Sequence, residues 1–417
     1  MNKEASCNTK LIFLFILLCI PFFPPEGLGF TSAVNVLVWF RRIQTCEVCA
    51  LILYECYDKF IHIHSYRKNK KEWNMFLLVS SLAVMQILCT VINSGSIYIA
   101  VQRVQLLVGV YIIVERFILK YPYTSLVTLT YVFLAVLIIN FIIIIALYDS
   151  MGFRVAGRVG GDFWLFGQKN TMRNITIPAL AFSAVLDRMN KKKISARTIF
   201  LSVIGIVSLY LVDSSSSLVV TAMFIFLLIF LCVTNYEIIN LKLISIFYVI
   251  LEILMVFLRK INIFSWIIEG VLGGDVTLTN RTYIWDIAIE LIGDKLWLGE
   301  GLRELEDSNL VIGSFHASHA HNALLDIMLK CGIIGAVLLI IIVVLSIRQL
   351  LKQKGSALGA VFGMALGSFL IVGIVGELWN FGFFLILFCS YYLQEIIDRI
   401  KITDNKYIRK QYIRFRI

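Results

Sequence analysis

Residues 126–147 read LVTLTYVFLAVLIINFIIIIAL, 22 consecutive residues without a charged side chain. A helix of this length and composition can cross the hydrocarbon core of a bilayer, which is about 30 Å thick. Similar uncharged runs occupy residues 11–23, 199–212, 218–233 and 333–347. These runs predict an all-α, polytopic integral membrane protein.

The composition of the chain excludes a soluble domain. Hydrophobic residues make up 59% of the 417 residues and charged residues 16%, and the mean hydropathy is +0.86. Soluble domains have roughly 45–50% apolar and 25% charged residues. The net charge of +11 comes without a nucleic-acid-binding motif, so we attribute it to membrane topology and expect no nucleic acid as a partner.

We interpret residues 1–417 as one membrane domain with about twelve transmembrane helices. The first apolar run could instead be a signal peptide, but Pro21, Pro24 and Pro25 follow it without a convincing cleavage site. The expected spans lie near residues 10–23, 43–58, 75–93, 97–118, 124–147, 174–187, 198–213, 217–235, 242–258, 321–346, 356–375 and 378–395.

Basic residues set the expected orientation. With the N-terminus inside, 25 Lys and Arg fall on the cytoplasmic side and 11 on the other. Cytoplasmic loops of membrane proteins carry the excess of basic residues, so both termini are predicted to be cytoplasmic. The basic tail, residues 396–417, is then expected to contact lipid headgroups.

Two long segments, residues 148–173 and 259–320, lie on the opposite, extracytoplasmic face in this topology. Long connections in compact proteins are usually functional or disordered. These two contain many aromatic residues that can pack together, so we expect them to form one ordered cap. The aromatic residues are Phe163, Trp164, Phe166, Trp266, Tyr283, Trp285 and Trp297.

The second of these segments carries the residues best suited to chemistry. It contains Arg281 and ends in His316-Ala-Ser-His319-Ala-His321-Asn322, directly before an apolar helix. A histidine at a helix N-terminus lies where the helix dipole disfavours its charged form, so the imidazole can accept a proton. An arginine fork can bind two phosphate oxygens at once.

The order of these motifs resembles the O-antigen ligase and polymerase superfamily. The similarity consists of Arg281 and Trp285, then Gly299 and Gly301, then His321-Asn322 before a helix with Gly332 and Gly335. Further back, Gly161-Asp-Phe163 through Gln168-Lys169-Asn170 is similar to a Gly-x-Phe…Asn signature, and the serines at 214–217 stand where relatives often have a Ser-Arg pair.

This resemblance implies a bacterial cytoplasmic (inner) membrane enzyme with its active site on the extracytoplasmic face. The implied reaction is a metal-independent, inverting glycosyl transfer from an undecaprenyl-pyrophosphate-linked oligosaccharide, with a second lipid-linked unit as acceptor. No cofactor is expected. Membrane lipids and a chain-length regulator are the other expected partners.

The resemblance also implies roles for particular residues. His321 would be the catalytic base and Arg281 the principal phosphate clamp. Leu218 follows Ser217 where relatives have an arginine, so phosphate binding would depend on basic residues elsewhere. The expected substrate-binding residues are Arg154, Arg158, Lys169, Asn170, Arg173, Trp285, His319, Asn322 and Glu377.

Each assignment has a structural alternative. His321 could cap its helix, Arg281 could form an ion pair with Asp275, Asp286 or Glu290, and Trp285 could be a packing residue. Arg154 and Arg158 could contact headgroups. Two further groups are expected to be structural: an Asp326–Lys330 ion pair within one helix, and the Cys46–Cys49 pair in helix packing. His316, His319 and His321 have a spacing that could bind a metal, but without nearby cysteines we expect no metal site.

Three functions remain open from the sequence. The favoured one is polymerisation of lipid-linked repeat units into surface polysaccharide, such as O-antigen or capsule, by a glycosyltransferase. A ligase that transfers a finished chain to lipid A-core or another acceptor would use the same donor chemistry. A flippase or ion-coupled transporter should instead carry ionisable residues near the bilayer midplane and duplicated halves.

Overall fold

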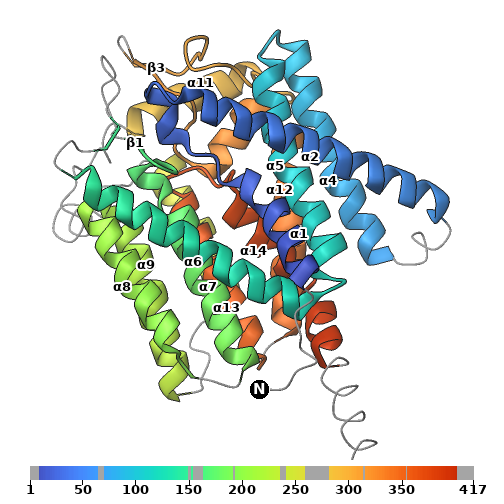
Figure 1. The fold of residues 1–417 in the computed structure, drawn as a ribbon. Helices are drawn as coiled ribbons and strands as arrows, with labels where there is room; N and C mark the ends of the chain where they lie inside the picture. Colours follow the sequence, from blue (N-terminus) through green and yellow to red (C-terminus); the bar gives the residue numbers. More distant parts are fainter. Residues whose placement is uncertain are drawn as a thin grey trace, which may run out of the picture.

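The computed structural model describes residues 9–63, 70–148, 152–153, 163–190, 193–234, 241–258, 281–312, 315–353 and 355–401 (Figure 1). Apart from two short antiparallel hairpins, the regular structure in these residues is helical. The α-helices are α1 Thr9–Cys19, α2 Val34–Ile61, α4 Lys70–Ile92, α5 Ile97–Ile112, α6 Pro122–Ala146, α7 Arg173–Met189, α8 Ala196–Leu211, α9 Ser215–Thr234, α10 Leu241–Leu251, α11 Arg281–Asp294, α12 Ala323–Lys352, α13 Ala357–Gly373 and α14 Phe381–Tyr391.

Short elements connect or extend these helices. Three 3₁₀ turns are η1 Ile20–Phe22, η2 Glu26–Phe30 and η4 Lys169–Thr171, and two π-helical turns are η3 Ile113–Ile118 and η5 Glu252–Phe257. The hairpins pair β1 Phe163–Trp164 with β2 Gly167–Gln168, and β3 Val311–Ile312 with β4 Phe315–His316.

The helical membrane class is confirmed, but twelve spans are not. Among the described residues, five helices are long and apolar enough to cross a bilayer, or six if a bent pair at 381–401 counts as one span. The five are Lys70–Ile92, Ile97–Ile118, Pro122–Ala146, Ser215–Thr234 and Ala323–Lys352. Each of the other predicted spans coincides with a helix that is too short or too polar for this criterion.

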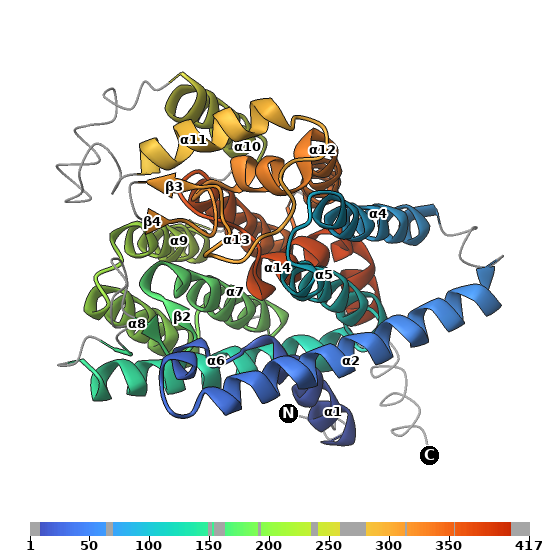
Figure 2. The same cartoon turned by 90° about the horizontal axis from the view of Figure 1, so that it is seen from above.

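The predicted span 43–58 is part of one longer helix, α2, which also contains Arg41 and Arg42. Figures 1 and 2 show α2 running obliquely along one flank of the bundle. Its buried charges are paired with η3: Lys59 Nζ lies 3.0 Å from Glu115 Oε1, and Glu55 accepts a hydrogen bond from Arg116. Helix α2 therefore extends beyond the predicted span in both directions, and paired charges accompany its C-terminal end.

The centre of the bundle is α14. All of its eleven residues are buried, and Figure 2 shows it surrounded by α5, α7, α12 and α13. Phe381 lies 5.1 Å from Phe22 and 6.1 Å from Phe133, between ring centroids. Asn380 starts the helix by accepting a hydrogen bond from the backbone N–H of Phe383 at 2.9 Å.

Helix α12 is broken at Gly332, whose φ of 61° and ψ of −169° are not helical. Two backbone hydrogen bonds from the preceding loop replace those lost at the break. Ile333 N–H donates to Leu296 O at 2.8 Å, and Glu300 N–H donates to Leu329 O at 2.6 Å. The break therefore becomes the docking point of the Gly299-Glu300-Gly301 loop.

The same loop is attached to the end of α4. Gly299 and Gly301 have φ values of 66° and 76°, which favour glycine. Asn93 donates to Gly299 O at 3.0 Å, and Leu302 N–H donates to Thr90 Oγ1 at 3.1 Å. The loop thus joins α4 to α12 through its backbone, and its glycines have a packing role.

We predict that Gly332→Ala destabilises the protein by roughly 1–3 kcal/mol or more, because this backbone conformation is essentially restricted to glycine. A Cβ atom there would also overlap the carbonyl oxygen of Trp297. Thermal unfolding in detergent would measure the loss. Gly363→Ala is the matched control, because a Cβ at this helical glycine meets no atom within 4 Å. Equal melting temperatures for the two variants would contradict the prediction.

Candidate functional site

The start of α12 is held by Asn322, which is fully buried. Its Oδ1 accepts a hydrogen bond from Leu325 N–H at 2.8 Å, and its Nδ2 donates to Glu252 Oε1 at 2.7 Å and to Ile374 O at 3.1 Å. The capping role considered for His321 therefore belongs to its neighbour Asn322. These bonds occupy the amide, so we assign Asn322 to positioning His321 and not to substrate contact.

His321 adopts a left-handed conformation with φ of 50°. This conformation is uncommon for a residue with a side chain and indicates a position that the surrounding structure enforces. The His321 ring lies 4.1 Å from the His319 ring, between centroids. His319 Nδ1 in turn lies 2.9 Å from Ser318 Oγ, so two imidazoles stand together at the helix entrance.

Both imidazoles are held in the neutral form. Burial is the main cause that lowers the pKa of His321 well below its usual range, and repulsion by protonated His319 and by the charge of Arg281 lowers it further. Burial likewise lowers the pKa of His319 to about 4. Neutral imidazoles at pH 7 can accept a proton.

Two arginines, Arg173 and Arg281, lie in the same region. Among the described residues, neither Arg173 nor Arg281 has a carboxylate within 4.0 Å. Burial lowers the pKa of Arg281 to about 10 and that of Arg173 to about 9, and the charge of Arg281 adds to the effect on Arg173. Arginine nevertheless stays protonated in proteins, so these charges favour a bound anion.

The ion-pair alternative for Arg281 finds no support in the described residues. Asp286 and Glu290 share α11 with Arg281, but no ion pair joins either of them to it. Asp275, the third acid considered, lies outside the described residues.

A chain of hydroxyl groups connects the first loop to Arg173. Ser214 Oγ lies 3.2 Å from Asn170 Oδ1 and 2.8 Å from Ser217 Oγ, within hydrogen-bond distance of both, and Arg173 Nη1 donates to Ser217 Oγ at 3.5 Å. Arg173 therefore places a positive charge beside Ser217. Leu218, which stands where relatives have an arginine, cannot supply this charge. Lys169 forms an exposed ion pair with Asp213 at 3.3 Å at the edge of this region.

A four-membered charge network lies beside the histidines. Asp326 pairs with Lys330 at 2.6 Å and with Arg103 of α5 at 3.2 Å. Arg103 also pairs with Glu377 at 3.4 Å and lies 4.4 Å above the Trp379 ring. The predicted Asp326–Lys330 pair is confirmed, but Arg103 was missed as its partner, because sequence reasoning placed it in an unrelated span.

The structure changes the interpretation of Trp285. Its side chain has 0% exposure and packs in α11 with Ala288, Ile292 and Leu329. A fully buried ring cannot stack on a substrate, so its assignment to substrate binding was wrong and the packing alternative holds. Arg154 and Arg158 lie outside the described residues.

Two candidates remain, His316 and Glu377. His316 Nδ1 contacts Ser308 O at 3.0 Å. Glu377 lies close enough to His321 and Arg173 for its charge to raise the pKa values of both. Among the described residues, no group of three or more His, Cys, Asp or Glu side chains is arranged to hold a metal ion.

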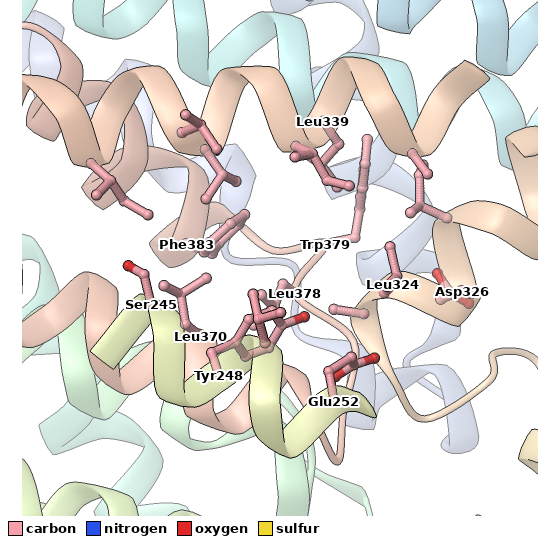
Figure 3. A pocket seen from close by; sticks show the side chains of 18 of the residues that line it. Ser245, Tyr248, Glu252, Leu324, Asp326, Leu339, Leu370, Leu378, Trp379 and Phe383 are labelled. Carbon is pink, nitrogen blue, oxygen red and sulfur yellow. The ribbon is translucent and has the colours of Figure 1, made fainter. Parts of the chain in front are cut away.

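An apolar groove of about 380 Å³ opens beside this site (Figure 3). Side chains of α10, η5 and α12 face each other across it, among them Tyr248 and Leu339. Arg103, Glu252 and Asp326 are the charged residues that line it. The groove therefore combines an extended apolar wall with a small number of charges close to His321.

A second, polar cavity of about 350 Å³ shares Arg103 and Trp379 with this groove. It lies among the η1–η2 segment, α2, α5 and the start of α14. Its polar residues are Glu26, Arg41, Gln44, Gln102, Arg103, Thr171, Asn174, Glu377 and Asn380. Except for Glu377, sequence reasoning did not connect these residues with the site, because they come from distant parts of the chain.

Comparison with known proteins agrees with the motif order. Residues 200–340 match the family model described as O-Antigen ligase. A segment of 97 residues is 32% identical to the exopolysaccharide production protein ExoQ of Rhizobium meliloti (strain 1021), covering 21% of this chain and 22% of the relative. These matches confirm the resemblance to the O-antigen ligase and polymerase superfamily.

We predict that His319 titrates near pH 4 and His321 well below 6.5, and that Arg281→Ala raises the His321 pKa because a nearby positive charge is removed. NMR of histidine-labelled protein in nanodiscs would measure both values. Arg348→Ala, an exposed position near the other end of α12, should leave them unchanged. A His321 pKa of 6.5 or higher would contradict this electrostatic description.

Proposed function

We propose, from the O-antigen ligase match of residues 200–340, that this protein polymerises undecaprenyl-pyrophosphate-linked oligosaccharide units into surface polysaccharide. In this proposal the donor glycan leaves its pyrophosphate carrier and joins a hydroxyl of a second lipid-linked unit, with inversion at the anomeric carbon and without a metal ion. The protein is then a glycosyltransferase of the bacterial inner membrane, acting on the extracytoplasmic face.

The single observation that carries the proposal is a pair of arginines, without a carboxylate partner among the described residues, beside a neutral histidine. Arg173 and Arg281 lie close enough for their charges to interact, and Arg281 also acts on His321. A departing pyrophosphate gains negative charge as its bond to the sugar breaks. Preorganised cations in a site shielded from water stabilise this charge.

The neutral imidazole supplies the second requirement. A sugar hydroxyl is a poor nucleophile at neutral pH and reacts faster when a positioned base removes its proton. In the proposed step the acceptor oxygen bonds to the anomeric carbon, the carbon–oxygen bond to pyrophosphate breaks with its electron pair, and the hydroxyl proton passes to His321. Lys169, Asn170 and His319 are assigned to the margin of this substrate site.

The apolar groove fits the polyprenyl part of such a donor. Its wall contains exposed aliphatic residues of α10 and α12, such as Val249, Ile340 and Val344. A long isoprenoid chain can lie against such a wall, because burying apolar surface is favourable. The charged end of the groove would then place the pyrophosphate near His321.

The orientation of the protein in the membrane, the extracytoplasmic cap and the number of spans belong to the same proposal. Both termini are placed in the cytoplasm on the basis of the basic residues, and α11 with the Gly299–Gly301 loop would form part of an extracytoplasmic cap. Figure 1 shows α11, β3 and β1 towards one end of the bundle. Crossing of the membrane by the shorter helices, to make twelve spans, is also part of the proposal.

A ligase is the second candidate, because the matching family model is described as O-Antigen ligase. The relative is named for exopolysaccharide production, so the two names point to different products. Purified protein supplied with lipid-linked repeat units from a strain that lacks it would separate them. Polymerisation predicts a ladder of extended chains from these units alone, whereas a ligase requires a separate acceptor. No transfer under either condition would overturn both candidates.

We predict that Arg281→Ala abolishes chain extension, because the phosphate clamp is lost while Arg281 makes no ion pair with a described residue. Arg281→Lys should restore activity only partly, since a point charge does not reproduce the two-point fork. Gel analysis of surface glycan would measure the product, with Arg348→Ala as a control for loss of a basic side chain. Full-length polymer from Arg281→Ala, with normal protein level, would refute the role.

We predict that His321→Ala slows the chemical step roughly 100- to 10,000-fold, the usual effect of losing a general base, and that His319→Ala has a smaller effect. Because the pKa of His321 is lowered, its basic form persists as the pH falls from 8 to 6.5. The wild-type rate should therefore stay level in this range and fall only at lower pH. A larger defect in His319→Ala would move the base to another residue, with Glu377 as the next candidate.

A further inference from the structure

The polar cavity between α2, α5 and α14 contains amide groups that the described protein leaves unsatisfied. Gln102 Nε2, Asn174 Oδ1 and Asn380 Nδ2 are buried and have no hydrogen-bond partner among the described residues. All three residues line this cavity. Unsatisfied buried polar atoms are unfavourable, so their convergence from three different helices indicates a site for a ligand rich in hydrogen-bonding groups.

Aromatic rings form another part of the cavity wall. Phe166 of the first loop, Phe381 and Trp379 line it. The Trp379 ring is fixed, because its Nε1 donates to Arg103 O at 3.0 Å and the Arg103 guanidinium lies 4.4 Å from the ring centroid. A wall that combines amide groups with aromatic rings matches a sugar, which carries hydroxyl groups on its edge and an apolar C–H face.

The charges that line the cavity favour an uncharged sugar. Glu26 and Glu377 are balanced by Arg41 and Arg103. Burial raises the pKa of Glu26 to about 6, although the charge of Arg41 opposes this. A carboxyl group with this pKa exchanges its proton near neutral pH, so it can either accept a hydrogen bond from a hydroxyl or donate one.

The cavity lies next to the proposed reaction site. The charge of Glu377 acts on Glu26 within the cavity and on His321 outside it. Arg103 and Trp379 form the boundary with the apolar groove on the other side. A sugar in the polar cavity and a lipid in the groove would therefore approach the same residues from opposite directions.

We propose that this cavity is the acceptor glycan subsite, which binds an uncharged sugar through Gln102, Asn174 and Glu26 and packs its apolar face on Trp379. This assignment rests on the proposed function, because it names the part of the substrate that does not carry the departing pyrophosphate. The donor lipid lies in the groove, and the acceptor sugar presents its hydroxyl towards His321.

The test uses lipid-linked repeat units from a strain that lacks the protein, and the oligosaccharide released from them by mild acid. Calorimetric titration of the oligosaccharide into full-length protein in nanodiscs measures glycan binding, and chain extension of the lipid-linked units measures KM and kcat. Gln102→Leu and Glu26→Gln should each weaken oligosaccharide binding and raise KM about two- to tenfold, the effect of one or two lost hydrogen bonds. The value of kcat should change much less.

Gln86→Leu is the matched control. Gln86 is a buried glutamine of α4 whose amide atoms also have no hydrogen-bond partner among the described residues, but it does not line this cavity. Its replacement should leave oligosaccharide binding and KM at wild-type values.

The two proposals fail in different ways. Wild-type extension with unchanged binding and KM in Gln102→Leu and Glu26→Gln would overturn the subsite and leave the polymerase function standing. In the opposite case, the wild-type protein binds the oligosaccharide but extends no chains, and the two variants bind it more weakly. This result would support the subsite and overturn the polymerase function.

Discussion

The break in α12 at Gly332 is the constraint on which the proposed site depends. At this point the helix lacks its own backbone hydrogen bonds. Two hydrogen bonds with the preceding loop, to Leu296 O and from Glu300 N–H, replace them. The loop is fixed at its other side by α4. Since this loop lies between α11 and the His319–His321 segment, the break fixes the middle of the chain segment that carries Arg281 and His321.

A second consequence is the separation of positive and negative charge around the site. Asp326 and Glu377 are taken up by Arg103 and Lys330, so Arg173 and Arg281 remain without a carboxylate among the described residues. A protein core tolerates unpaired buried cations only when other interactions hold them in place. In the proposed function this arrangement favours an anionic substrate, and the charge of Arg281 adds to the effect of burial in lowering the pKa of the nearby imidazoles.

The two cavities differ in polarity and lie on different sides of the same residues. The apolar groove faces α10 and α12, whereas the polar cavity lies among η1, η2, α2 and α5. Arg103 and Trp379 lie between them and belong to both. A lipid and a sugar differ in the surface they can bury, so in the proposed function this boundary would separate the lipid of the donor from the sugar of the acceptor.

The sequence by itself determined the membrane class and most of the helical elements, and it singled out Arg281 and His321 as candidates, because apolar runs and short motifs are local properties of the chain. The assignment of Trp285 to substrate binding was wrong and the twelve spans are not confirmed, since burial and helix length are decided by neighbours. Only the tertiary structure joined Arg103, Glu26 and Gln102 to the site, as these residues come from different helices. It also showed that Asn322, not His321, caps α12, because hydrogen bonds to Glu252 and Ile374 depend on packing between distant segments.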